Sequence, residues 1–120
     1  MRKIFFFAIL IGTTSPALAQ SNCLEPVMPT QVDGSVASAD QLRAAMAEAR
    51  AFIAESSVYQ SCLLQEVDAA KTQAAATGQP FEPMVETSAR NRIAASEKAQ
   101  DKVGNAINGS VSAYKLVHAD

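Results

Sequence analysis

The sequence predicts an all-α protein: a long antiparallel two-helix hairpin of coiled-coil type, with an extended N-terminal segment packed along it and stapled to it by a disulfide. Three observations predict this fold. Apolar residues recur at steps of three and four over two long stretches, which is the spacing of one helix face. A short segment with a glycine and two prolines separates these stretches, and both residue types end helices. The chain also has only two cysteines, one in the N-terminal segment and one in the first stretch.

Residues 1–19 have the pattern of a secretory signal peptide. Arg2 and Lys3 give a positive start, residues 4–11 are apolar, and residues 17–19 (Ala-Leu-Ala) form a small-residue cleavage site. The apolar run is shorter than the roughly 18 residues that a membrane span needs, so no membrane insertion is expected after cleavage. The mature chain is therefore expected to be periplasmic or secreted.

The charge of the mature chain excludes two classes of partner. Removing Arg2 and Lys3 from ten basic residues leaves eight against twelve acidic ones, a net charge of −4. Nucleic acids and anionic bilayers are bound through basic faces. Neither kind of binding is expected.

Residues 20–37 are expected to form an extended leader. Pro26 and Pro29 disfavour a helix, and Asp33-Gly34 is a turn signal. We call this segment the leader.

Cys23 and Cys62 are expected to form a disulfide, because two cysteines in a short exported chain lie where such bonds persist. An intermolecular bond and two free thiols are the alternatives. Cys62 lies some 23 residues, or about 35 Å of helix, beyond the start of the first helix. Residues 23–38 can span this distance only when extended, at about 3.3 Å per residue, so the bond would require them to run antiparallel along the first helix. The leader residues expected to cover the groove of the hairpin are Leu24, Val27, Met28 and Val32.

The first helix is expected over residues 39–76. Ser38 followed by Gln41 is a capping box, and Thr77-Gly78 is a stop signal. Residues 77–85 form a stiff connector that includes Pro80 and Pro83. The apolar positions at helical spacing are Leu42, Met46, Ala49, Phe52, Ile53, Tyr59, Leu63, Val67, Ala70 and Ala74.

The second helix is expected over residues 86–118. Gly104 and Gly109 each cost about 1 kcal/mol in a helix interior relative to alanine, so a bend or fraying is expected unless close packing needs small residues. A symmetric hairpin pairs residues whose numbers sum to about 162, which sets these glycines opposite bulky residues of the first helix. The same register predicts the ion pairs Glu48–Lys115, Glu66–Lys98 and Asp68–Arg92.

No motif for catalysis, metal or cofactor binding is found. His118 is the only histidine and lies two residues from the end, where a catalytic side chain is seldom held in place. No Cys-x-x-Cys zinc pattern occurs, and the scattered Met28, Met46 and Met84 indicate gap-filling in a core rather than a copper site. The protein is therefore expected not to be an enzyme and to need no cofactor.

These observations favour a non-enzymatic interaction module of the bacterial cell envelope, an accessory subunit or adaptor. It would bind a protein partner, or a second copy of itself, through an apolar helix face. In outline the hairpin resembles the periplasmic chaperones of envelope stress, although the LTxxQ repeats of one such family are absent, and this resemblance implies a holdase-like chaperone as the alternative. The residues expected to bind the partner are Phe52, Ile53, Tyr59, Leu63, Phe81 and Met84.

Overall fold

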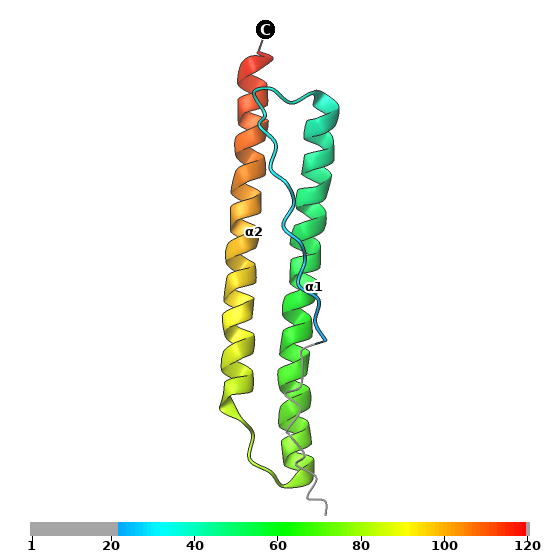
Figure 1. The fold of residues 1–120 in the computed structure, drawn as a ribbon, viewed down its shortest axis with the longest axis vertical. Helices are drawn as coiled ribbons and strands as arrows, with labels where there is room; N and C mark the ends of the chain where they lie inside the picture. Colours follow the sequence, from blue (N-terminus) through cyan, green and yellow to red (C-terminus); the bar gives the residue numbers. More distant parts are fainter. Residues whose placement is uncertain (1–21, 120) are drawn as a thin grey trace, which may run out of the picture.

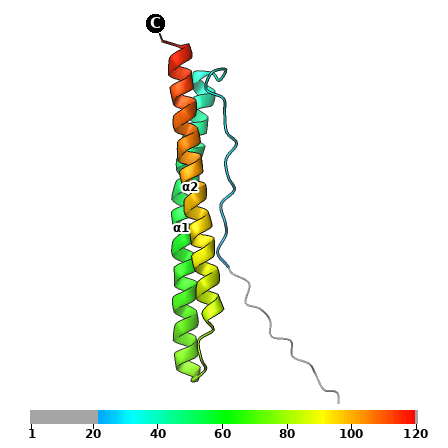
Figure 2. The same cartoon turned by 90° about the vertical axis from the view of Figure 1, so that its left-hand side faces the viewer.

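The computed structural model of the protein describes residues 22–119. Two helices, α1 (Ala39–Thr77) and α2 (Pro83–Val117), lie side by side and antiparallel, and the leader runs extended along them (Figures 1 and 2). Residues 22–119 contain no strand, so the predicted all-α hairpin is confirmed. The signal peptide expected over residues 1–19 lies outside the described residues. Neither α1 nor α2 is apolar enough over a sufficient length to cross a membrane.

Local sequence signals set both ends of α1. The Ser38 hydroxyl accepts a hydrogen bond from the backbone N–H of Gln41, and the Gln41 side chain accepts one from the backbone N–H of Ser38, which confirms the capping box. Gly78 ends the helix in the left-handed conformation, with φ of 66°, which glycine adopts without steric cost. The 39 residues of α1 span roughly 58 Å at about 1.5 Å per residue.

Helix α2 begins at Pro83, three residues earlier than expected, so the connector is shorter than predicted. Proline suits the first position of a helix because its missing N–H would have no partner there and its φ is already helical. The Glu82 side chain caps the helix by accepting a hydrogen bond from the N–H of Met84. The helix continues through Gly104 and Gly109 without interruption.

The register of the hairpin differs from the expected one. Gln60 donates to Ser96 at 3.0 Å and Lys71 pairs with Glu86 at 2.9 Å. The numbers of these facing residues therefore sum to 156 and 157, instead of about 162. The physical reason is that the connector folds back along the last turn of α1, because Phe81 packs against the apolar cluster nearest to it.

Two consequences expected from the symmetric register are therefore wrong. A Cβ added to Gly104 or Gly109 would meet no atom within 4 Å, so neither glycine makes room for a bulky residue. None of the expected ion pairs is present among those of residues 22–119. The pairs that form are Asp40–Arg43, Lys71–Glu86 and Glu86–Arg90.

The disulfide Cys23–Cys62 is present and holds the start of the leader against α1. From there every third residue, Cys23, Pro26, Pro29 and Val32, is buried or half-buried. Three residues per turn is the repeat of a polyproline II helix.

This repeat corrects the expected set of covering residues. Val32 lies over the groove between the helices, as predicted. Leu24 and Val27 instead face solvent, with 89% and 90% of their surface exposed, and Met28 is 42% exposed. The disulfide directs Cys23 inward, and the three-residue repeat then directs Pro26 and Pro29 inward as well. The residues between these positions therefore point outward.

The other end of the leader is fixed against α2. The Ser110 hydroxyl donates to the carbonyl oxygen of Val32, and a Cβ on Gly34 would overlap the carbonyl oxygen of Ser110. Only glycine allows this approach of two backbones. The turn is closed by Asp33, whose carboxylate accepts hydrogen bonds from the hydroxyl and N–H of Ser35, and these bonds lower the pKa of Asp33.

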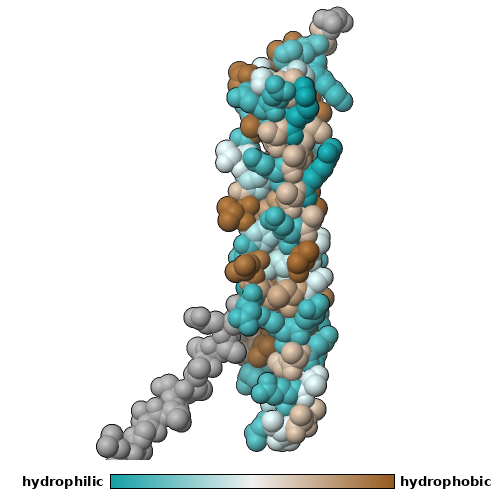
Figure 3. Space-filling model, turned by 90° about the vertical axis from the view of Figure 1, so that its right-hand side faces the viewer, coloured by the Kyte–Doolittle hydropathy of each residue, from teal (hydrophilic) through white to brown (hydrophobic). Residues whose placement is uncertain are grey.

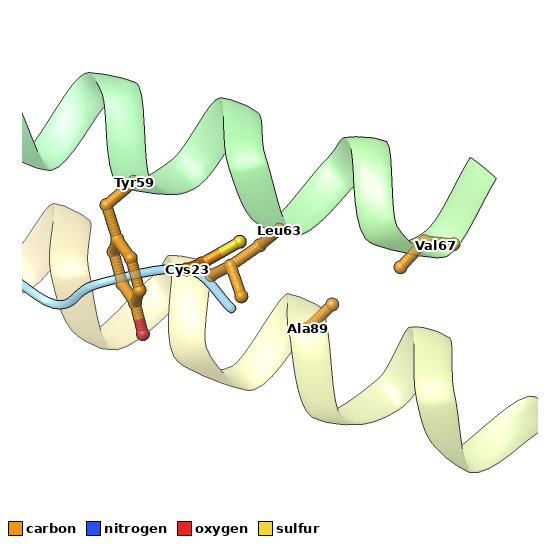
Figure 4. Packing of buried hydrophobic residues seen from close by; sticks show 5 residues of the cluster. All are labelled: Cys23, Tyr59, Leu63, Val67 and Ala89. Atoms are coloured by element: carbon orange, nitrogen blue, oxygen red, sulfur yellow. The ribbon is translucent and has the colours of Figure 1, made fainter. Parts of the chain in front are cut away.

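The core formed by residues 22–119 has two apolar clusters. The disulfide cluster combines Cys23 of the leader with Tyr59, Leu63 and Val67 of α1 and Ala89 of α2 (Figure 4). The second, which we call the upper cluster, lies nearer the start of α1. Its buried members are Ala49, Phe52 and Val103.

A polar layer separates the two clusters. Gln60 donates to Ser96 and to the side-chain oxygen of Gln100, both at 3.0 Å. Gln100 in turn donates to the carbonyl oxygen of Ile53 at 2.8 Å. Ser56 lies in the same layer, only 1% exposed, and its hydroxyl has no hydrogen-bond partner.

Candidate interaction surface

Three of the six residues expected to bind a partner lie inside the hairpin. Phe52, Tyr59 and Leu63 are 5%, 3% and 1% exposed. They pack against α2 and the leader, and the Tyr59 hydroxyl accepts a hydrogen bond from Arg92 at 2.9 Å. In this fold they stabilise the protein and are not available to a second molecule.

The other three residues do not form one surface. Ile53 is 37% exposed in the middle of α1, whereas Phe81 and Met84 lie at the connector. Phe81 is half-buried against the disulfide cluster, with the Lys71 ammonium 5.4 Å from the centre of its ring. It closes the end of the hairpin, and Met84 beside it is 66% exposed.

The structure exposes a different apolar surface, on the side of α1 that faces away from α2. Its residues follow one another at steps of three and four, and all are exposed. We call this surface the α1 outer face, and its members are Ala44, Ala47, Ala51, Ala54 and Val58.

The leader adds two large apolar side chains beside this face. Leu24, Pro26, Ala54, Val58 and the disulfide line one shallow groove. Val58 is 71% exposed, and within residues 22–119 Leu24 and Val27 are the most exposed of the large apolar residues. Figure 3 shows hydrophobic side chains standing out on this side of the molecule.

The sequence carried a signal for this surface. The steps of three and four from Ala44 to Val58 are as regular as those of the buried stripe. The signal is weak because alanine is common on exposed helix faces, and four of the five residues are alanines. The outward position of Leu24 had no such signal.

Charged residues flank the α1 outer face in an ordered way. Glu48 and Glu55 lie along the edge nearer the leader, and Arg43 and Arg50 lie along the opposite edge. Arg43 contacts Asp40 at 3.2 Å, with both side chains highly exposed, and such pairs contribute little. Among residues 22–119, Glu48, Arg50 and Glu55 form no ion pair.

One group of metal-ligand type occurs in the described residues. The sulfur atoms of Cys23 and Cys62 and a carboxylate oxygen of Glu66 lie within 4.8 Å of one another. Both sulfurs are committed to the disulfide, and Glu66 accepts a hydrogen bond from the N–H of Asn22 at 2.7 Å. This arrangement anchors the leader and is not a preformed metal site.

His118 lies at the exposed end of α2. Its ring stacks on Tyr114 with the centroids 4.0 Å apart, and its Nδ1 donates to the Tyr114 carbonyl oxygen at 2.9 Å. These contacts complete the last turn of the helix.

Comparison of the chain with protein-family models, with curated proteins and with solved structures found no match.

Proposed function

We propose that the protein is a non-enzymatic helical interaction module of the bacterial cell envelope, exported to the periplasm or beyond. In this role it acts as an accessory subunit or adaptor and binds a protein partner through the α1 outer face and the adjoining leader. The disulfide supports the location, since such bonds persist in oxidising compartments outside the cytoplasm.

The observation that carries this proposal is the exposure of large apolar side chains in one place. Leu24, Val27 and Val58 are each more than two-thirds exposed, and the groove between the leader and α1 is lined mainly by apolar residues. Exposed apolar surface that gathers in this way is typical of interaction sites. Burying it against a partner would contribute about 25 cal/mol per Å².

The leader also makes this surface rigid before a partner arrives. The disulfide fixes one end of the leader to α1, and the contact of Gly34 with Ser110 fixes the other end to α2. A binding surface that is already ordered loses less conformational entropy on association.

Site-specific photocrosslinking in the native envelope tests the proposal. A photoreactive residue at Val58 should capture one dominant protein, and the same residue at Lys102, exposed on α2, should not. Val58→Asp should abolish capture, whereas Leu116→Asp, at a side chain of similar exposure, should leave it intact. Capture of many unrelated unfolded proteins would instead indicate a holdase-like chaperone.

A further inference from the structure

The α1 outer face has the pattern of a coiled-coil seam. Ala44, Ala51 and Val58 occupy one set of positions at intervals of seven, and Ala47 and Ala54 occupy the set between them. These are the a and d positions of a heptad repeat, which form the contact line between two supercoiled helices. In this protein the line is exposed, so no element of the hairpin occupies it.

The flanking charges favour one orientation of a partner helix. Arg43 and Arg50 take the g positions, and Glu48 and Glu55 take the e positions. In a parallel pair of helices, each g residue faces the e residue five positions later in the other helix. Arg43 would then meet Glu48 of a second copy, and Arg50 would meet Glu55.

An antiparallel arrangement of two identical helices brings e residues opposite e residues and g opposite g. Here that would place glutamates beside glutamates and arginines beside arginines, which is unfavourable. The same charges that attract in the parallel arrangement therefore oppose the antiparallel one.

We infer that two copies of this chain associate in parallel through their α1 outer faces. The two-fold axis runs along the helices, and each copy uses the same surface, so the assembly closes as a dimer. The small alanine side chains let the two helices approach closely. Leu24 and Val27 of each leader lie beside the seam on its acidic edge, where the second copy partly covers them. This inference rests on the proposed function, which makes the α1 outer face a protein-binding surface, and it names a second copy of the chain as the partner.

Charge reversal in the oxidised protein tests the parallel arrangement. Arg50→Glu and Glu55→Arg each replace two attractive contacts per dimer by two repulsive ones. In sedimentation equilibrium at low salt, each variant should raise the dissociation constant about tenfold or more. The double variant restores complementary charges and should return it to near the original value.

An equimolar mixture of the two single variants should form a mixed dimer in preference to either homodimer. In the mixed dimer the glutamate introduced at position 50 of one copy faces the arginine introduced at position 55 of the other. The native Arg50 and Glu55 form the second contact, so both contacts are attractive. Native mass spectrometry separates the three species, because the two variants differ in mass.

Matched controls on α2 exclude a general effect of charge. Lys102→Glu and Glu97→Arg make the same changes of charge at exposed positions and should leave the dissociation constant unchanged. Circular dichroism and a thiol assay establish that each variant is helical and oxidised.

Three results would overturn the inference: a protein that stays monomeric at several hundred micromolar, a dimer that the single reversals leave unchanged or tighten, and no preference for the mixed dimer. These failures are distinct from failure of the proposed function. A monomer whose Val58 still captures one foreign protein retains that function and rules out the second copy.

Discussion

Ser56→Ala should stabilise the protein, although serine is polar and the substitution lies in the core. The Ser56 side chain is 1% exposed, and its hydroxyl is the buried side-chain polar atom without a hydrogen-bond partner in residues 22–119. Burying a hydroxyl without a partner costs about 1 to 3 kcal/mol, and alanine removes this cost.

Two smaller effects accompany the change. Alanine is the better helix former by about 0.5 kcal/mol. Loss of one oxygen atom leaves only a small gap, which does not disrupt the packing of the polar layer. The free energy of unfolding is therefore expected to rise by about 1 to 2 kcal/mol, in addition to the gain from the higher helix propensity of alanine. For a domain of this size, each kcal/mol raises Tm by about 4 to 8 °C.

Urea unfolding of the oxidised protein, followed by circular dichroism, measures this gain. Ser61→Ala is the matched control, because Ser61 is exposed on the same helix and reports helix propensity alone. Ser96→Ala should lower stability by about 1 kcal/mol, since Gln60 loses an acceptor. If Ser56→Ala is no more stable than Ser61→Ala, the hydroxyl is not unsatisfied and the reasoning is wrong.

Three further perturbations test the leader and the connector. Gly34→Ala should destabilise the oxidised protein by about 1 to 3 kcal/mol in urea unfolding, because its Cβ overlaps the backbone of α2; Gly109→Ala, where space is open, should instead stabilise it by about 1 kcal/mol. Reducing the disulfide should lower the free energy of unfolding by about 3 to 4 kcal/mol under the loop-entropy model, and a leader that resists proteolysis equally before and after reduction would contradict this role. Lys71, and then Arg90, lower the pKa of Glu86 below its ordinary value of 4.5. The stabilisation from Glu86 is therefore present above pH 4.5 and is lost as the pH falls through the lowered pKa. Glu86→Gln should be less stable than the native protein at about pH 7, and urea titrations at successively lower pH should show this difference shrinking.

Signals that depend on neighbouring residues or on chain length were sufficient for much of the fold. The capping box at Ser38 and the stop at Gly78 each involve a few adjacent residues, so they could be recognised directly. The path of the leader follows from arithmetic, because two cysteines 39 positions apart in the sequence can join only if the leader is extended along α1.

Features that depend on packing could not be predicted in this way. The register is displaced because Phe81 packs against the disulfide cluster, and no periodicity in either helix encodes that contact. The expected inward position of Leu24 and Val27 is wrong, because the direction of each leader residue depends on the backbone twist between Cys23 and Pro26.

The candidate surface illustrates a further limit of sequence patterns. The apolar spacing through Phe52, Tyr59 and Leu63 predicts a helix face that must be covered. It does not say whether α2, the leader or another molecule covers it. The structure assigns that role to α2 and the leader, which leaves the weaker alanine pattern as the exposed one.

The position of the leader has a consequence for how the molecule loses its structure. The polar layer divides the core into two small clusters that share few apolar contacts, and such units can open separately. The leader spans the division, because Cys23 lies in the disulfide cluster and Val32 lies over Ala49 and Val103 of the upper cluster. With the disulfide intact, the leader therefore couples the two clusters into one cooperative unit, and amide hydrogens along both should exchange with similar protection. Reduction should weaken this coupling, so that amide protection falls first at the free end of the hairpin around Ala49.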